Sequence, residues 1–170
     1  YWQIKEELNW LPDLDDLRQL IRPQTKMICL NNANNPTGAV MDDVFLKEVA
    51  TIAASVGAYV LVDEIYTSFS ENNNSSIVDL YENGIAVNSL SKTYSLAGIR
   101  IGWVAANEKV ISILRDYRDY TLICAGVFDD MVAQLALENR QAIWKRNHRI
   151  IHENLSILDH WVSMQPRASY

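Results

Sequence analysis

Lys92 lies between two hydroxyl-bearing residues, Ser91 and Thr93, in a segment that runs from Ser89 to Arg100 and is rich in small residues. It follows an apolar run, 84–90, so we expect it to be partly buried. Its amine can act as a nucleophile that forms a Schiff base with a carbonyl group. Ser89, Ser91 and Arg100 can hydrogen-bond a phosphate ester, the arginine as a rigid two-pronged donor. The segment therefore predicts an anchor for a compound that carries both a carbonyl and a phosphate.

Two further polar segments occur upstream of the lysine. The first is Asn-Asn-Ala-Asn-Asn-Pro-Thr-Gly at 31–38, and the second is Val-Asp-Glu-Ile-Tyr at 62–66. Each of the three segments follows a run rich in Val, Ile and Leu, as buried parallel strands do. These runs are 26–30, 58–62 and 85–87. Because open α/β sheets bind ligands beyond the carboxyl ends of their strands, we expect the three segments to form one site.

Taken in chain order, these segments resemble the Asn-Pro-Thr-Gly loop, the Asp-x-x-Tyr signature and the Ser-x-Ser-Lys segment of the class I/II aminotransferases. These enzymes have fold type I and use pyridoxal 5'-phosphate. The resemblance implies an α/β fold, a three-layer sandwich around a mostly parallel sheet, as in the major domain of pyridoxal-phosphate-dependent transferases. It covers almost all of this chain but less than half of such an enzyme, so we expect the chain to be part of a longer protein.

The resemblance implies a role for each polar side chain. Lys92 would form the Schiff base and later move the proton of the substrate α-carbon. Asp63 would keep the pyridine nitrogen protonated so that the ring can accept electrons. Asn35 and Tyr66 would donate hydrogen bonds to the ring oxygen. The implied contacts of the phosphate are Ser89, Ser91 and Arg100.

The chain departs from the family pattern at two positions. Ala33 stands where a proline is common, and Ile99 stands where an aromatic residue often precedes the phosphate arginine. Neither change removes a reacting group. The resemblance also implies that the peptide bond between Asn35 and Pro36 is cis. Cis peptide bonds occur almost only before proline.

Transamination between an amino acid and a 2-oxo acid is the leading functional hypothesis. The same residues also serve carbon–sulfur β-lyases and some synthases and decarboxylases, because the cofactor stabilises the carbanion and the pocket decides which bond breaks. A third hypothesis is a ligand-sensing module on the same fold without catalysis. The complete set of Asn35, Asp63, Tyr66, Lys92 and Arg100 favours an enzyme.

Composition limits the partners and the cellular setting. The 15 basic and 21 acidic residues give a net charge of −6, which argues against a nucleic-acid or anionic-membrane surface. We expect small-molecule partners, and the resemblance implies that these are an amino acid and a 2-oxo acid and that the full-length protein is a homodimer. Cys29 and Cys124 follow no disulfide pattern, so we expect reduced core residues and a cytoplasmic location. His148 and His152 are four residues apart without a third ligand nearby, and we predict no metal site.

The rest of the chain alternates between strand and helix patterns. A segment from Ile101 to Ala106 follows the lysine loop too soon for a crossover helix, so we expect an antiparallel strand. The segment 71–76 is polar and carries no packing signal. Helices are predicted at 13–21, 42–56, 108–120, 127–138 and 140–162. We expect residues 1–145 to belong to a large cofactor-binding domain, and 146–170 to lead along a long helix toward a small domain.

Overall fold

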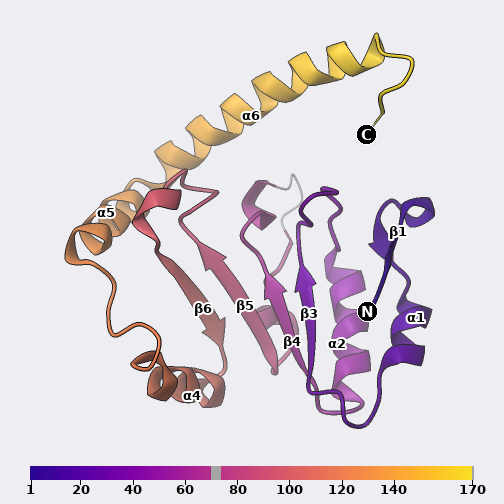
Figure 1. The fold of residues 1–170 in the computed structure, drawn as a ribbon, viewed down its shortest axis with the longest axis vertical. Helices are drawn as coiled ribbons and strands as arrows, with labels where there is room; N and C mark the ends of the chain where they lie inside the picture. Colours follow the sequence, from indigo (N-terminus) through magenta and orange to yellow (C-terminus); the bar gives the residue numbers. More distant parts are fainter. Residues whose placement is uncertain (70–73, 170) are drawn as a thin grey trace.

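A four-stranded sheet forms the centre of the computed structural model, which describes residues 1–69 and 74–169 (Figure 1). Its strand order is β3-β4-β5-β6, and β3, β4 and β5 are parallel. β6 runs antiparallel to β5, as predicted from the short connection between them. The strands are β3 (Met27–Asn31), β4 (Tyr59–Asp63), β5 (Gly84–Ser89) and β6 (Gly102–Ala106).

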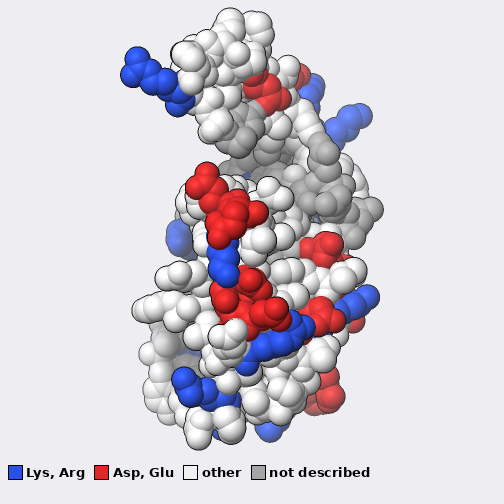
Figure 2. Space-filling view, turned by 90° about the vertical axis from the view of Figure 1, so that its right-hand side faces the viewer, with Lys and Arg blue, Asp and Glu red and all other residues white. Residues whose placement is uncertain are grey.

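A short hairpin and a helix precede the sheet. The hairpin pairs β1 (Ile4–Lys5) with β2 (Leu11–Pro12) and was not predicted, because two-residue strands leave no period in the sequence. Helix α1 (Leu14–Leu20) follows, and Asp13 caps it by accepting a hydrogen bond from the amide of Asp15. Lys5 forms ion pairs with Asp13 and Asp16. Figure 2 views this side of the molecule and shows acidic and basic side chains intermingled on its surface.

Helices α2 and α3 pack on the same face of the sheet as α1. Asp42 caps the N-terminus of α2 (Asp43–Ala54), where its carboxylate accepts a hydrogen bond from the amide of Phe45. Gly57 follows the helix at a φ of 67°, which glycine adopts without strain. α3 (Ile77–Leu80) is a single turn that the sequence did not indicate. The core lies between these helices and the sheet, and its fully buried members include Val49, Ala53, Val60, Val62 and Ile77.

The opposite face of the sheet is covered in part by α4 (Glu108–Arg118). Its apolar residues and those of the strands line a cavity of about 280 Å³. Cys29 is exposed on β3, and Cys124 is exposed between α4 and α5. The prediction that both cysteines lie in the core is therefore wrong. Residues alternate between the two faces of a strand, so Cys29 points away from the face on which its buried neighbour Ile28 packs.

The chain ends in two further helices, α5 (Val127–Glu138) and α6 (Arg140–Ser163), close to their predicted bounds. In the part of the chain that the structure describes, three short 3₁₀ helices occur in connections, at Glu6–Leu8, Thr67–Phe69 and Ala97–Ile99. Figure 1 shows that α6 crosses the edge of the sheet at which the three parallel strands end. Within the described residues, no helix is both long and apolar enough to span a membrane.

Candidate active site

The three predicted segments meet at the carboxyl edge of the parallel strands. Asn31 is the register partner of Asp63, and Asp63 is the partner of Val87 in the next strand. Asn31 also links two segments through its side chain. Its Oδ1 accepts a hydrogen bond from the amide of Asn35 at 2.7 Å, and its Nδ2 donates to the carbonyl of Asp63 at 3.4 Å. Asn31 is part of the Asn-rich motif, but its residue type and spacing alone do not indicate this role.

The Asn loop between β3 and α2 is held by its own side chains. Asn32 is 2% exposed, and its carboxamide makes hydrogen bonds to both the amide and the carbonyl of Met41. Oδ1 of Asn34 accepts a hydrogen bond from Oγ1 of Thr37 at 2.8 Å. The Asn35-Pro36 peptide bond is cis, as expected, and the Asn32-Ala33 bond is cis as well.

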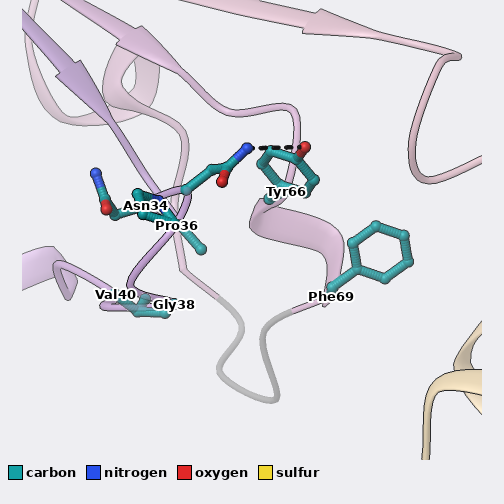
Figure 3. A pocket seen from close by; sticks show the side chains of 8 residues that line it. Asn34, Pro36, Gly38, Val40, Tyr66 and Phe69 are labelled. Carbon is teal, nitrogen blue, oxygen red and sulfur yellow. Dashed lines mark hydrogen bonds between the residues drawn. The ribbon is translucent and has the colours of Figure 1, made fainter. Parts of the chain in front are cut away.

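Asn35, Tyr66 and Lys92 approach one another beside this loop. Nδ2 of Asn35 donates a hydrogen bond to the Tyr66 hydroxyl at 3.4 Å. Nζ of Lys92 lies 5.7 Å from the centroid of the Tyr66 ring. Figure 3 shows the Asn loop and Tyr66 on two sides of a cleft of about 360 Å³, which Phe69 also lines. One residue from each of the three segments therefore reaches the same region.

Asp63 and Glu64 are adjacent carboxylates in different environments. Oδ1 of Asp63 accepts a hydrogen bond from the amide of Ile65 at 3.1 Å at the end of β4. The Glu64 carboxylate accepts hydrogen bonds at 2.9 Å from the hydroxyl of Ser76 and the amide of Ile77, at the start of α3. Burial raises the pKa of Glu64 above its ordinary value, and these hydrogen bonds oppose the rise. Glu64 thus serves the packing of α3.

The polar segment 71–76 is more ordered in part than its sequence suggested. Residues 71–73 lie outside the described residues, so that part of the prediction is untested. Ser75, however, gives its amide and its hydroxyl to the Asp43 carboxylate, at 2.8 and 2.6 Å. These two hydrogen bonds hold the pKa of Asp43 below its ordinary value. The prediction that the segment lacks packing is wrong for residues 74–76, because its serines pair with carboxylates distant in sequence.

The predicted phosphate contacts lie in the loop between β5 and β6. The hydroxyl of Ser89 accepts a hydrogen bond from the amide of Ser91 at 3.1 Å. Arg100 is exposed in a left-handed conformation, at a φ of 56°, and one guanidinium nitrogen donates to the carbonyl of Ala97 at 2.8 Å. A guanidinium has five N–H donors, so this bond leaves capacity for an anion. A Cβ at Gly102 would lie 2.7 Å from the Asn88 carbonyl, which explains the glycine where β6 begins.

Lys92 is exposed in this structure. The expectation of partial burial is therefore wrong for this chain, because the lysine stands in the loop beyond β5 rather than within the strand. Its neighbours do anchor it, since Leu90 is fully buried and Thr93 is 6% exposed. The carbonyl of Lys92 accepts a hydrogen bond from the amide of Ser95 at 3.0 Å. The backbone at Lys92 is fixed while its amine faces solvent.

Known proteins share this sequence pattern and this fold. The family model for aminotransferase class I and II matches residues 1–162. A solved PLP-dependent aminotransferase from Streptococcus suis has a TM-score of 0.96 and 68% identity over 99% of this chain. The glutamate-pyruvate aminotransferase AlaA of Escherichia coli is 41% identical over 156 residues, and an aspartate aminotransferase of Pyrococcus horikoshii is 35% identical over 145 residues. Each of these two alignments covers 84% of this chain.

The chain belongs to the aminotransferase class I and II family. Its sheet, with three parallel strands and one antiparallel strand, confirms the predicted fold class. The chain spans less than half the length of its relatives. It covers 45% of the Streptococcus protein, 38% of AlaA and 37% of the Pyrococcus enzyme.

Proposed function

We propose that the full-length protein is a pyridoxal-phosphate-dependent aminotransferase that moves an amino group between an amino acid and a 2-oxo acid. The observation that carries the proposal is the approach of Asn35, Tyr66 and Lys92 to one another beyond the ends of three strands. The membership of the family and the aminotransferase names of the similar proteins support it.

The donor set fits pyridoxal phosphate group by group. The hydrogen bond of 3.4 Å between the Asn35 amide and the Tyr66 hydroxyl brings two donors to one point, where an anionic ring oxygen would lie. Asp63 supplies the single carboxylate that suits a protonated pyridine nitrogen. The phosphate would be held by the hydroxyls of Ser89 and Ser91 and by the guanidinium of Arg100. The Lys92 amine would bind the aldehyde carbon covalently.

Pyridoxal phosphate, when bound, supplies an electron sink that stabilises negative charge on the substrate α-carbon. The residues of this chain supply the rest. Lys92 Nζ, once displaced by the substrate amine, would take the proton from the substrate α-carbon and deliver it to the cofactor carbon that is bonded to the amino nitrogen. Asp63 would hold a proton at the pyridine nitrogen by its negative charge, and Tyr66 and Asn35 would hold the ring oxygen as an anion. Lys92 is thus both the anchor and the acid–base group.

We also propose the arrangement of the full-length protein. Residues 1–145 belong to the large domain, and 146–170 lead toward the small domain; the exposure of every residue from Arg149 to Trp161 supports this division. A homodimer is supported by the large apolar side chains exposed on α4 and α5, such as Tyr117 and Phe128. We place the protein in the cytoplasm, where its cysteines would stay reduced.

The full-length enzyme with Lys92→Ala tests the reaction. With an amino acid and no acceptor, the wild type should form about one equivalent of 2-oxo acid per site, and an added 2-oxo acid should restart turnover with ping-pong kinetics. Lys92→Ala should lose this reaction, whereas Lys26→Ala, at the far end of β3, should retain it. Catalytic release of ammonia and pyruvate without an acceptor would indicate a β-lyase instead. Binding without turnover across a broad panel of amino acids would indicate a sensor.

A further inference from the structure

Thr93 lies in the loop between β5 and β6 that carries Lys92, and its side chain contacts the segment that follows β4. It is 6% exposed, although its side chain is polar. Its hydroxyl is in hydrogen-bond contact with the hydroxyl of Ser68, and it lies 3.5 Å from the carbonyl of Ile65. Ile65 and Ser68 flank Tyr66 in the chain. The residue next to Lys92 therefore touches both sides of the segment that carries Tyr66.

Asn147 of α6 contacts the backbone of Thr93. It is 5% exposed, and its Nδ2 donates a hydrogen bond of 2.8 Å to the carbonyl of Thr93. Its Oδ1 accepts a hydrogen bond from the guanidinium of Arg146. Both groups of this buried carboxamide are therefore paired. Among the buried residues of α4 to α6 that the structure describes, Asn147 is the only one with a polar side chain.

The same face of α6 also reaches Ser68. Nε1 of Trp144 donates to the Ser68 carbonyl at 3.3 Å, and Nε2 of His148 lies 2.7 Å from the same oxygen. The rings of Trp144 and His148 pack together, with 4.1 Å between their centroids. Residues spaced three or four apart share one face of a helix, which is why 144, 147 and 148 act together. One rigid helix thus contacts both loops.

We propose that Asn147 is a positioning residue, which holds the Lys92 loop in place relative to Tyr66 through the carbonyl of Thr93. The inference rests on the proposed function, because Lys92 and Tyr66 matter only if both act at the cofactor. A carboxamide that stabilised only its own helix would make its hydrogen bonds within that helix. Asn147 instead bonds to the residue that follows Lys92, 54 positions away in the chain. Directional hydrogen bonds to buried backbone groups fix loops more narrowly than apolar contacts do.

Two variants of the full-length enzyme test the proposal. Asn147→Leu keeps the volume and removes the donor, and Asn147→Asp keeps the contact with Arg146 but cannot donate to the Thr93 carbonyl. The matched controls are Asn154→Leu and Asn154→Asp, at an exposed position on the same helix. Misplacing a reacting group by about 1 Å can cost about 100-fold, so we expect kcat to fall about tenfold to 100-fold while KM for the amino acid changes little.

Two readouts separate positioning from general stability. In the cofactor-free protein, amide hydrogen exchange of residues 92–96 should accelerate about tenfold in both Asn147 variants, while exchange in β3 to β5 stays unchanged. In the loaded enzyme, the pH midpoint of the visible absorption band should shift in both variants and in neither Asn154 control.

The proposal is overturned if the Asn147 variants match the Asn154 controls in two measurements. These are the amide hydrogen exchange of residues 92–96, and the size of the change in kcat relative to the change in KM. It is also overturned if both Asn147 variants fail to fold, because the residue is then structural. Failure of the proposed function is recognised separately. A wild type that does not carry the cofactor on Lys92 refutes that function, while the exchange data still decide whether Asn147 orders the Lys92 loop.

Discussion

The region beside α3 and the region beside the cleft differ in the lengths of the hydrogen bonds between their polar groups. On the side of α3, Glu64 and Asp43 accept short hydrogen bonds from Ser75, Ser76 and Ile77, all between 2.6 and 2.9 Å. On the side of the cleft, the Asn35-Tyr66 contact is 3.4 Å, and the Lys92 amine is exposed. The two adjacent acids differ in their partners, because Glu64 accepts hydrogen bonds from Ser76 and Ile77 at the start of α3, whereas Asp63 accepts one from the amide of Ile65.

This difference in hydrogen bonding separates polar groups that are satisfied within the fold from polar groups that remain available to a ligand. Buried polar groups in a folded chain are normally satisfied within it, and the α3 side follows this rule. Side chains at a binding site keep donor capacity that the ligand uses. Pairing with residues of another element, the start of α3, therefore distinguishes Glu64 from Asp63, whose carboxylate accepts a hydrogen bond from the nearby amide of Ile65.

The largest expected effect is at Asp63. Replacing it with Ala in the full-length enzyme removes the negative charge that holds the pyridine proton, so kcat should fall about 100-fold or more, as it does when a single stabilising group is lost at a catalytic site. Glu64→Gln keeps an acceptor for the amide of Ile77, and kcat should change by no more than about threefold. Steady-state kinetics at saturating cofactor measure both. Equal losses at the two positions would break the distinction between the regions.

A smaller effect is expected in the pH dependence of stability. Glu64 has a raised pKa in the folded state, so its contribution is present at low pH and is lost as the pH rises through that value. Asp43 has a lowered pKa, so its contribution is present above the ordinary range of a carboxyl and is lost as the pH falls. Relative to wild type, Glu64→Gln should become more favourable from about pH 4 to pH 7, whereas Asp43→Asn should become less favourable.

Urea unfolding of the full-length protein at several pH values checks these opposite slopes. Glu48→Gln, an exposed carboxylate of α2 that pairs with Arg18, is the control and should show a smaller slope than either. Parallel curves for Glu64→Gln and Asp43→Asn would show that the two carboxylates do not differ in the way their hydrogen bonds and burial suggest.

The parts of the fold with strong local signals were predictable from the sequence. The three parallel strands, the antiparallel return of β6 and the helices from α4 to α6 follow from apolar runs, helical periods and caps such as Asn107, which accepts a hydrogen bond from the amide of Val110. The small hairpin, the single turn of α3 and the exposure of Cys29 were missed. These depend on pairing partners and on which face of the sheet is covered, and neither leaves a local pattern.

The candidate site was predictable where residue type decides chemistry, and less so where contacts do. Asn35, Tyr66 and Lys92 were predicted from motifs. The structure places Asn35 and Tyr66 in one cleft and the Lys92 amine 5.7 Å from the Tyr66 ring. Asn147 could not be found this way, because an asparagine in the middle of a helix has no distinctive spacing. Asn31 was visible in its motif, yet its link to Asp63 requires the register of two strands.

Borohydride reduction tests the central proposal most directly. The full-length protein, purified with its cofactor, is reduced, digested and analysed by mass spectrometry. We expect the cofactor to be fixed to the peptide that contains Lys92, with none on that peptide in a Lys92→Ala variant. A reduced adduct on Lys26, Lys47 or another lysine, or no adduct at all, would contradict the assignment of Lys92 as the anchor.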